Sequence, residues 1–243
     1  MDRPAPLAVA GMVIAGATVV LLAHGQAAVL DTGTWDQVEA VTVTNGPEAA
    51  MNLLEDLPVQ EASSTAGYDR DLFGPSWSDD VNVEGGHNGC DTRNDLLRRD
   101  LVDVTIRSGT RGCVVQSGTL HDPYTGHVMP FLRGTDEASQ IHVDHVVSLA
   151  NAWATGAQNL DEQTRRDLAN DPLNLWVVDG AQNQAKSDAD VAEWLPPHRG
   201  SWCDLVTTQL QVKAKYDLWA TPAEVDTMRQ ILNGCTQSVT GAR

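Results

Sequence analysis

The residues best suited to chemistry stand in two short stretches, IHVDHVVSL at 141–149 and NLWVVDGAQNQAKSD at 174–188. Asp144 and His145 are adjacent in the first stretch, and Asn183 and Lys186 lie close together in the second. An imidazole has an ordinary pKa of about 6.5, so it can accept a proton near neutral pH. Carboxylate and amide oxygens are the ligands that Mg²⁺ or Mn²⁺ prefers.

These residue types match what hydrolysis of a phosphodiester requires, namely a base, a bound cation and a positive group. His145 is the expected base, and Asp144 and Asn183 are the expected metal ligands. Lys186 follows Asn183 by three residues, so on a helix both share a face and the ammonium is expected to reach the phosphate. Asn174 is expected to hold the loop that carries His145 through backbone hydrogen bonds.

Three further residues are candidates for support of this site or for contact with phosphate. His142 lies two residues before Asp144, on the same strand face, and is expected to be structural or to support the site. Arg70 and Arg93 belong to the densest basic region and suit bidentate contact with phosphate. Aspartates interleave with this region, so intramolecular salt bridges are the alternative interpretation.

The elements around these residues are short. A strand is expected to run through the first stretch into a helix at about 146–157, and a second helix is expected from Asp161 to Leu168. NLWVV has the composition of a short buried strand, and a helix is expected from Gln182 to Trp194, before two prolines. This order of strand, strand and helix would bring the chemical residues around one point.

The rest of the chain predicts a mixture of helices and one hairpin. The TPAE sequence at 221–224 predicts a capping box that opens the last helix, and Gly234 is expected to end it. The other expected elements are a helix at 47–57, a helix from Thr92 to Leu101, a β-hairpin over 113–131 around DPYTG, and two helices in about the last 40 residues.

Four cysteines lie beyond the N-terminal segment, at positions 90, 113, 203 and 235. An even number in an exported chain predicts two disulfides, and no CxxC pair points to zinc. Neighbours along the sequence give the pairs Cys90–Cys113 and Cys203–Cys235, which is one of three possible pairings.

An apolar, uncharged run follows Arg3 and ends among small residues, which is typical of a secretory signal peptide. A retained membrane anchor is the alternative, since the run is just long enough to span a bilayer. The expected organisation is a signal peptide or anchor at 1–28, an N-terminal segment and linker at 29–66, a nuclease-like domain at 67–236 and a tail at 237–243.

The charge balance is strongly acidic, with 33 Asp and Glu against 16 Lys and Arg and a net charge of −17. This argues against a generic nucleic-acid binder, because affinity for a phosphate backbone comes mostly from Lys and Arg. An acidic excess also keeps exported proteins soluble, so the charge can report the environment and not the ligand. A metal ion and a local basic cluster would then have to hold a nucleic acid beside an acidic body.

Taken together, DH at 144–145, NL at 174–175 and NQAK at 183–186 resemble the three parts of the HNH, or ββα-metal, endonuclease motif. Longer blocks, among them GCDTRNDLLRRDL, DPYTG and VDHVVSLANAW, are similar to exported bacterial proteins related to the C-terminal nuclease domain of GmrSD-type restriction enzymes. The likeness covers roughly residues 67–220. It implies a divalent-metal-dependent nuclease with His145 as base, Asp144 and Asn183 as metal ligands and Asn174 as the loop-fixing asparagine.

The sequence departs from the wider HNH pattern in two ways. The insertion between His145 and Asn174 is long and helical, and the zinc-holding CxxC pairs of many relatives are missing. Disulfides would take over the bracing role of zinc in an exported protein.

The sequence therefore predicts an α+β fold with a ββα-metal core, a helical insertion, a β-hairpin, C-terminal helices and two disulfides. The expected function is a secreted endonuclease that uses Mg²⁺ or Mn²⁺ to cut DNA, with RNA as a second substrate. A non-catalytic exported binding module on an HNH-like scaffold is the alternative. A metallopeptidase is disfavoured, because no HExxH pattern is present.

Overall fold

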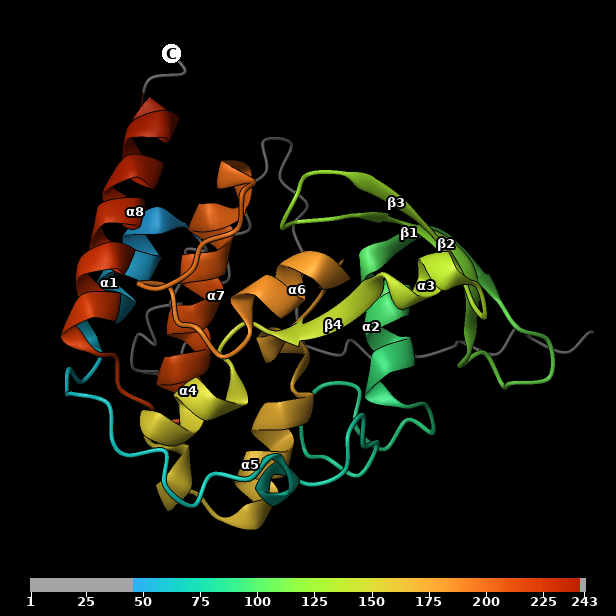
Figure 1. Cartoon of the computed structure of the whole chain (residues 1–243), viewed down its shortest axis with the longest axis horizontal. Helices are drawn as coiled ribbons and strands as arrows, with labels where there is room; N and C mark the ends of the chain where they lie inside the picture. Colours follow the sequence, from blue (N-terminus) through green and yellow to red (C-terminus); the bar gives the residue numbers. More distant parts are fainter. Residues whose placement is uncertain (1–45, 241–243) are drawn as a thin grey trace, which may run out of the picture. The chain divides into compact units, whose positions relative to one another are not determined.

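The computed structural model describes residues 46–240, with side chains for residues 46–235. The expected signal peptide or anchor at 1–28 lies outside the described residues, as do residues 29–45. The described part is a mixed α+β unit with two small sheets, and it contains no helix long and apolar enough to cross a membrane (Figure 1). Its elements are α1 Pro47–Asp56, η1 Arg70–Phe73, α2 Thr92–Asp100, β1 Leu101–Ile106, β2 Val115–His121, β3 Val128–Leu132, α3 Asp136–Ser139, β4 Ile141–His145, α4 Leu149–Ala154, η2 Ala157–Asn159, α5 Glu162–Asn170, η3 Pro172–Asn174, β5 Leu175–Asp179, α6 Gly180–Lys186, η4 Arg199–Ser201, α7 Trp202–Lys215 and α8 Pro222–Thr240.

Three antiparallel strands, β1, β2 and β3, form the larger sheet in that order. The expected hairpin at 113–131 is confirmed in β2 and β3, which the DPYTG turn joins. Gly126 in this turn has a φ of 74°, a left-handed conformation that glycine adopts without strain. The pattern does not predict β1, because Asp103 has a positive φ of 52° and the register with β2 shifts there, which interrupts the alternation of a strand.

The smaller sheet is the antiparallel pair of β4 and β5, and α6 follows β5 directly. Asp144 pairs with Trp176, and His145 pairs with Leu175 at the end of the ladder. The side chain of Asp179 caps α6 by accepting a hydrogen bond from the backbone N–H of Gln182 at 2.8 Å. The expected order of strand, strand and helix is therefore present, and α6 contacts both strands.

The faces of β4 have different surroundings. Ile141 and Val143 belong to a buried cluster with Leu175 and Val177 of β5 and with side chains of α2. Because successive side chains of a strand point to opposite faces, His142 and Asp144 lie on the other face. That face is the one on which the side chains of α6 contact β4.

Two expected helices are wrong in length. The helix expected from Gln182 to Trp194 ends at Lys186, because Ser187 takes a left-handed φ of 50° and its N–H returns to the carbonyl of Asn183. Asp190 then accepts backbone N–H groups two and three residues ahead, which makes a turn.

The helix expected at 146–157 is α4, which covers only Leu149–Ala154. Ser148 is its N-cap and accepts a hydrogen bond from the backbone N–H of Asn151 at 3.1 Å. Residues 146 and 147 stay outside the helix, because Asn174 occupies their backbone groups. The second helix of the insertion is confirmed as α5.

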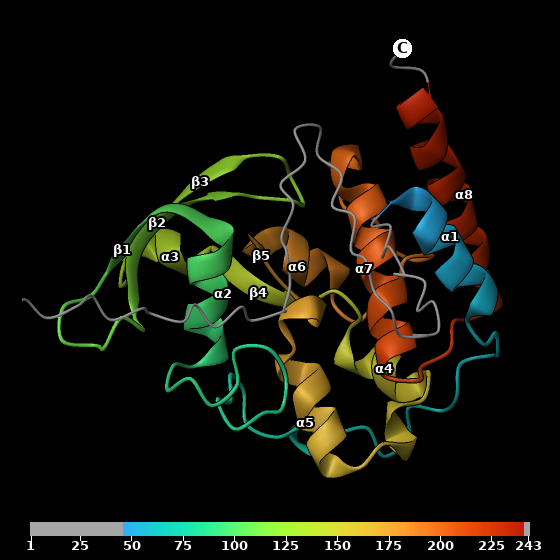
Figure 2. The ribbon, with the colours of Figure 1, turned by 180° about the vertical axis from the view of Figure 1, so that it is seen from behind.

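Three helices form a separate core. Helix α1 packs against α7 and α8, although it precedes residue 67, where the domain is expected to start (Figure 2). The expected capping box of α8 is confirmed, since Thr221 and Glu224 exchange backbone-to-side-chain hydrogen bonds of 2.7 and 3.2 Å. Gly234 does not end this helix, which continues to Thr240.

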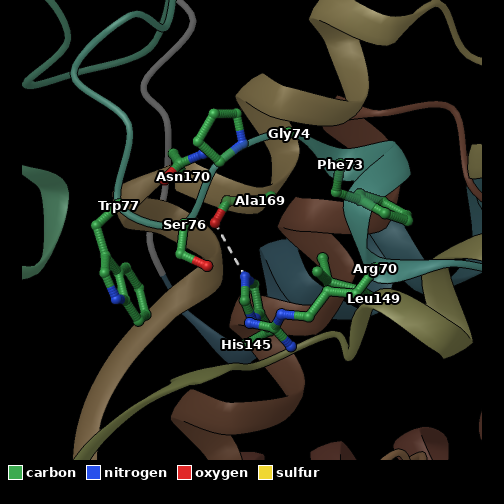
Figure 3. A pocket seen from close by; sticks show the side chains of 10 residues that line it. Arg70, Phe73, Gly74, Ser76, Trp77, His145, Leu149, Ala169 and Asn170 are labelled. Carbon is green, nitrogen blue, oxygen red and sulfur yellow. Dashed lines mark hydrogen bonds between the residues drawn. The ribbon is translucent and has the colours of Figure 1, made fainter.

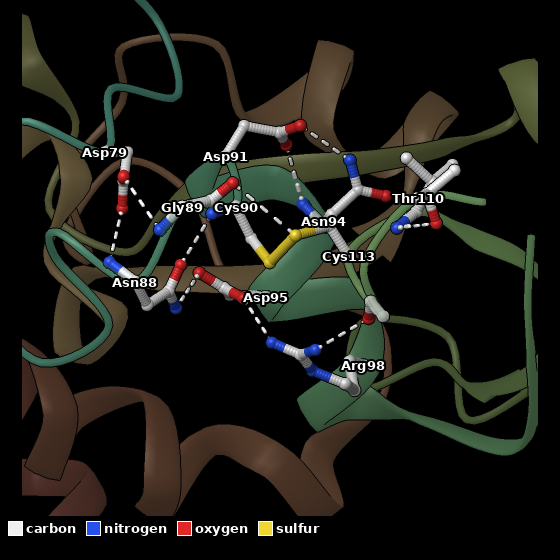
Figure 4. Close-up of a disulfide and its surroundings, with 12 residues drawn as sticks. Asp79, Asn88, Gly89, Cys90, Asp91, Asn94, Asp95, Arg98, Thr110 and Cys113 are labelled. Carbon is white, nitrogen blue, oxygen red and sulfur yellow. Dashed lines mark hydrogen bonds and ion pairs between the residues drawn. A yellow bond between two sulfur atoms is a disulfide. The ribbon is translucent and has the colours of Figure 1, made fainter.

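Both expected disulfides are confirmed, Cys90–Cys113 and Cys203–Cys235. The first ties the loop before α2 to the connection between β1 and β2, beside a network of polar side chains that includes Asp95 and Arg98 (Figure 4). The second ties the start of α7 to α8. The bridges therefore brace the two sides of the fold separately.

Candidate active site

A polar pocket of about 220 Å³ lies where β4 ends. Four residues expected from the sequence border it, namely Arg70, Asp144, His145 and Asn183. They come from η1, β4 and α6, so the fold brings separate segments to one cavity. The complete lining is Tyr68, Arg70, Val143, Asp144, His145, Ser148, Leu149, Asn183, Ser187 and Asp188.

His145 is the last residue of β4, and its ring lies in a fixed orientation. Its Nε2 lies 2.9 Å from the carbonyl oxygen of Ala169, at the end of α5 (Figure 3). A carbonyl oxygen can only accept, so Nε2 carries the proton of the neutral ring. The other nitrogen, Nδ1, makes no hydrogen bond to any described residue. A lone pair is therefore left at Nδ1.

The environment of His145 keeps its ring neutral. Burial lowers the pKa of the imidazole from 6.5 to about 3. The hydrogen bond to Ala169 opposes this shift, and the positive charges of Arg70 and Lys186 add to it. His145 is therefore in the form that accepts a proton across the whole neutral range.

Asp144 is buried and makes two charged or polar contacts through one oxygen. Its Oδ2 accepts a hydrogen bond of 2.6 Å from the hydroxyl of Tyr124 and lies 3.0 Å from the ammonium of Lys186. Burial raises the pKa of the Asp144 carboxyl, whereas Lys186 and Tyr124 lower it. On balance the pKa stays raised, so the lysine offsets only part of the effect of burial on the carboxylate.

Lys186 ends α6, and its side chain is only 2% exposed. Its Nζ donates to Oδ1 of Asp144 at 3.2 Å and to the carbonyl oxygen of His145 at 2.8 Å. The ammonium thus lies behind Asp144 and does not line the pocket. In this arrangement the ammonium contacts Asp144 and the His145 carbonyl and not the pocket, because the spacing of three residues fixes the helix face but not the depth of the side chain.

Asn183 and His142 contact one another at the pocket. The Nδ2 of Asn183 lies 3.3 Å from Nδ1 of His142, so the amide nitrogen donates and the imidazole accepts. The amide oxygen of Asn183 makes no hydrogen bond within the described part of the chain. His142 therefore orients the amide group whose oxygen is free for another partner.

Asn174 is fully buried and holds the backbone that follows His145. Its Oδ1 accepts from the N–H of Val147 at 2.8 Å, and its Nδ2 donates to the carbonyl of Val147 at 3.2 Å. Its own carbonyl accepts from the N–H of Val146. Asn174 thus fixes the segment after the histidine through the backbone groups of Val146 and Val147.

The two candidate arginines have different positions. Arg70 is exposed, lines the pocket and makes no hydrogen bond or ion pair among the described residues; it lies beside His145 (Figure 3). Arg93 is directed to the start of β4, where it donates to the carbonyl of Ile141 at 3.0 Å. Burial, together with the charge of Arg133, lowers the pKa of Arg93. Arg93 therefore pins the strand and does not border the pocket.

Four residues at this site are not predicted from the sequence. Tyr68, Ser148 and Asp188 line the pocket. Tyr124 does not line it, but its hydroxyl donates a hydrogen bond to Asp144. Ser148 and Asp188 stand close to expected residues in the sequence, so proximity was an available signal. Tyr124 lies in a turn of the other sheet, and only the folded chain brings it to Asp144.

The pocket offers oxygen donors to a cation. Within residues 46–235, no group of three or more His, Cys, Asp or Glu side chains is arranged to hold a metal ion. Asp144 and Asn183 both border the cavity, and each side chain carries oxygen atoms that can bind a cation. Mg²⁺ is usually held by one or two carboxylates, with water and substrate phosphate in its other positions. The donor set fits a hard divalent cation of this kind.

The chain has recognisable relatives. Residues 91–231 match the family of the C-terminal domain of GmrSD restriction endonucleases. A protein of Arthroderma benhamiae named "Uncharacterized secreted protein" is 36% identical over 198 residues, which is 80% of this chain and 89% of that protein. No solved structure matches the chain. The matched residues include β4, β5 and α6, and the chain belongs to the GmrSD restriction endonuclease C-terminal domain family.

Proposed function

We propose that this protein is an exported endonuclease that hydrolyses phosphodiester bonds in DNA with the help of a divalent metal ion, Mg²⁺ or Mn²⁺. RNA is a second substrate of the same chemistry. One observation carries the proposal: a neutral histidine with an unbonded nitrogen borders the same polar pocket as an aspartate and an asparagine. Membership in an endonuclease domain family supports it.

His145 is the proposed base. Its Nε2 is held by Ala169, so Nδ1 takes the proton from a water molecule as the water oxygen attacks phosphorus. The bond from phosphorus to the leaving oxygen breaks, and that oxygen takes a proton from solvent. The rigid backbone after His145, held by Asn174, keeps the ring in place during this transfer.

Asp144 and Asn183 are the proposed ligands of the metal ion. When bound, the ion stabilises negative charge on the phosphate and on the leaving oxygen. Arg70 is the proposed contact to phosphate, since its guanidinium lies at the pocket without another partner. Lys186 acts through Asp144, because its ammonium lowers the pKa of the buried carboxyl and so favours the anionic form that can bind a metal ion.

Export is the proposed localisation. The relative named as a secreted protein supports it, as do the two disulfides, which persist in oxidising compartments. The apolar segment at 1–28 is the proposed signal peptide.

The test is cleavage of circular DNA by the purified protein with Mg²⁺, Mn²⁺ or EDTA. We expect nicking and linearisation with either metal and none with EDTA. His145→Ala should lower the rate by at least about 100-fold, the usual contribution of a general base. His87→Ala is the control, because that imidazole is exposed in a loop outside the pocket. Equal cutting by His145→Ala would overturn the proposal, and a wild type that binds DNA without cutting it would favour the non-catalytic binding module.

A further inference from the structure

The DPYTG turn between β2 and β3 is fastened to the unit formed by β4, β5 and α6. Asp122 is 1% exposed, and its Oδ1 accepts a hydrogen bond of 2.9 Å from the backbone N–H of Asp179, the residue that caps α6. The same carboxylate accepts backbone N–H groups from Tyr124 and Thr125 within the turn. One buried side chain thus closes the turn and attaches it to the start of α6.

This attachment places the side chain of Tyr124 next to Asp144, which lines the pocket. The tyrosine is fully buried, and its ring packs against Trp194 and Trp176 at centroid distances of 5.0 and 6.2 Å. Its hydroxyl donates to Oδ2 of Asp144 at 2.6 Å. The aromatic neighbours hold the ring, which places the hydroxyl oxygen within hydrogen-bond distance of Asp144.

We propose that Tyr124 is a positioning residue that sets the orientation of the Asp144 carboxylate for metal binding. This inference rests on the proposed function, in which Asp144 is a metal ligand. The hydroxyl of Tyr124 holds Oδ2, which also has the shorter contact to Lys186. Oδ1 has the longer contact to the lysine, at 3.2 Å, and is the oxygen proposed to bind the ion.

The lysine cannot fix this orientation by itself. Its ammonium contacts both oxygens of Asp144, at 3.0 and 3.2 Å, and an ammonium is a compact charge with rotatable donors. A partial rotation of the carboxylate plane would change that contact little. The directional bond from Tyr124 restricts this rotation, and such outer hydrogen bonds to metal ligands commonly change metal affinity 10- to 100-fold.

The chain contains a matched control for this arrangement. Tyr216 donates to Oδ2 of Asp171 at 2.7 Å, and that same oxygen also binds the ammonium of Lys215. Both the tyrosine and the aspartate are buried, and neither lines the pocket. Removal of the Tyr216 hydroxyl therefore has the same local chemistry as removal of the Tyr124 hydroxyl, but at a carboxylate that does not line the pocket.

The experiment measures Mn²⁺ binding by calorimetry and DNA cleavage for the wild type, Tyr124→Phe and Tyr216→Phe. We expect Tyr124→Phe to raise the Kd for Mn²⁺ by about 10-fold and to lower kcat, with a smaller effect on the KM for DNA. Tyr216→Phe should leave the Kd and kcat unchanged. Both variants should unfold at similar temperatures, since each loses one buried phenol-to-carboxylate bond.

A second variant separates positioning from general loosening of the turn. Thr125→Val removes a hydroxyl that bonds Asp122 and leaves the Tyr124 hydroxyl in place. We expect its Mn²⁺ affinity to equal that of the wild type, whereas an effect as large as that of Tyr124→Phe would overturn the positioning role. A wild type that binds Mn²⁺ and cuts DNA, with an unchanged Kd in Tyr124→Phe, would overturn this inference alone. A wild type that neither binds Mn²⁺ nor cuts would overturn the proposed function as well.

Discussion

The surroundings of His145 keep its imidazole unprotonated at neutral pH, and the same lowered pKa makes the ring a weaker base than a solvated imidazole. A solvated imidazole is protonated for part of the neutral range, but burial lowers the pKa of this one to about 3. The lowered pKa reduces the free energy of unfolding only below about pH 6.5, because the unfolded chain then binds a proton that the folded chain excludes. The hydrogen bond to Ala169 keeps Nε2 occupied, so that accepting chemistry is confined to Nδ1.

We predict that His145 destabilises the metal-free protein as the pH falls below 6.5. The unfolded imidazole has a pKa of about 6.5 and the folded one a pKa of about 3, so stability is complete above pH 6.5 and is lost as pH falls through this window. The loss is at most about 1.4 kcal/mol per pH unit. Urea unfolding with EDTA at several pH values from 4 to 8 would measure it.

The comparison is with His145→Gln, which cannot take up this proton. The free energy of unfolding should fall less steeply with decreasing pH in His145→Gln than in the wild type, and the two curves should run parallel above pH 7. His87→Gln is the control, because its side chain is 59% exposed. Parallel curves at all pH values for wild type and His145→Gln would contradict the prediction.

At the level of single residues, the sequence predicts which residues share a site better than it predicts how deeply each side chain is buried. The types and spacing of Asp144, His145 and Asn183 sufficed to expect them at one site, and they border one pocket. Lys186 was expected at the phosphate, but it is buried behind Asp144. Periodicity gives the direction of a side chain around a helix, whereas burial depends on what packs over it, which a single sequence does not reveal.

At the level of elements, the ion pair of Asp144 and Lys186 joins β4 to α6. Both side chains are nearly buried, with exposures of 7% and 2%. A buried ion pair contributes little compared with an apolar pair, but loss of one partner leaves an uncompensated charge. The pair therefore makes the contact between the strand and the helix specific.

We predict that Lys186→Met destabilises the protein by about 3 to 5 kcal/mol, because the carboxylate of Asp144 stays buried without its cation. The double variant Asp144→Asn with Lys186→Met should recover much of that loss, since no charge remains in the buried position. Urea unfolding of the two single variants and the double variant forms a cycle that gives the coupling energy. A loss below about 1 kcal/mol in Lys186→Met would show that water reaches the pair.

Sequence patterns predict some elements of this fold and fail for others. Helix α8 and the β2–β3 hairpin follow strong local signals, a capping box and a Pro-Gly turn, and both were predicted. Helix α6 ends eight residues earlier than expected, because a single non-glycine residue, Ser187, takes a left-handed conformation. Strand β1 is not predicted, because a register shift interrupts the alternation of its apolar and polar residues. Both differences arise from backbone conformations that residue types alone do not predict.

At the scale of the whole molecule, the net charge of −17 has to be reconciled with a nucleic-acid substrate. Nucleic-acid binding proteins release counterions from phosphates through many Lys and Arg contacts. Among the described residues, Arg70 is the one Lys or Arg that lines the pocket. The acidic body repels the remainder of a long duplex, so the local contact and the metal ion have to supply the attraction.

We therefore predict an unusually shallow salt dependence of DNA cleavage for a nuclease. The logarithm of affinity falls with the logarithm of salt with a slope of about −0.9 per phosphate contact. One or two contacts give a slope between about −1 and −2, whereas six contacts would give about −5. The measurement is kcat/KM for a short duplex from 50 to 300 mM KCl at constant Mg²⁺.

The cation responsible for this slope can be identified by substitution. Arg70→Ala should raise KM about 10-fold and bring the slope close to zero, because it removes the one basic side chain at the pocket. Arg107→Ala is the matched control, since Arg107 is also exposed and makes no side-chain hydrogen bond or ion pair among the described residues, but it lies on the connection between β1 and β2. It should leave both values unchanged. A steep slope in the wild type that Arg70→Ala does not alter would mean that the substrate follows another surface of the protein, and that net charge is a poor guide to its binding path.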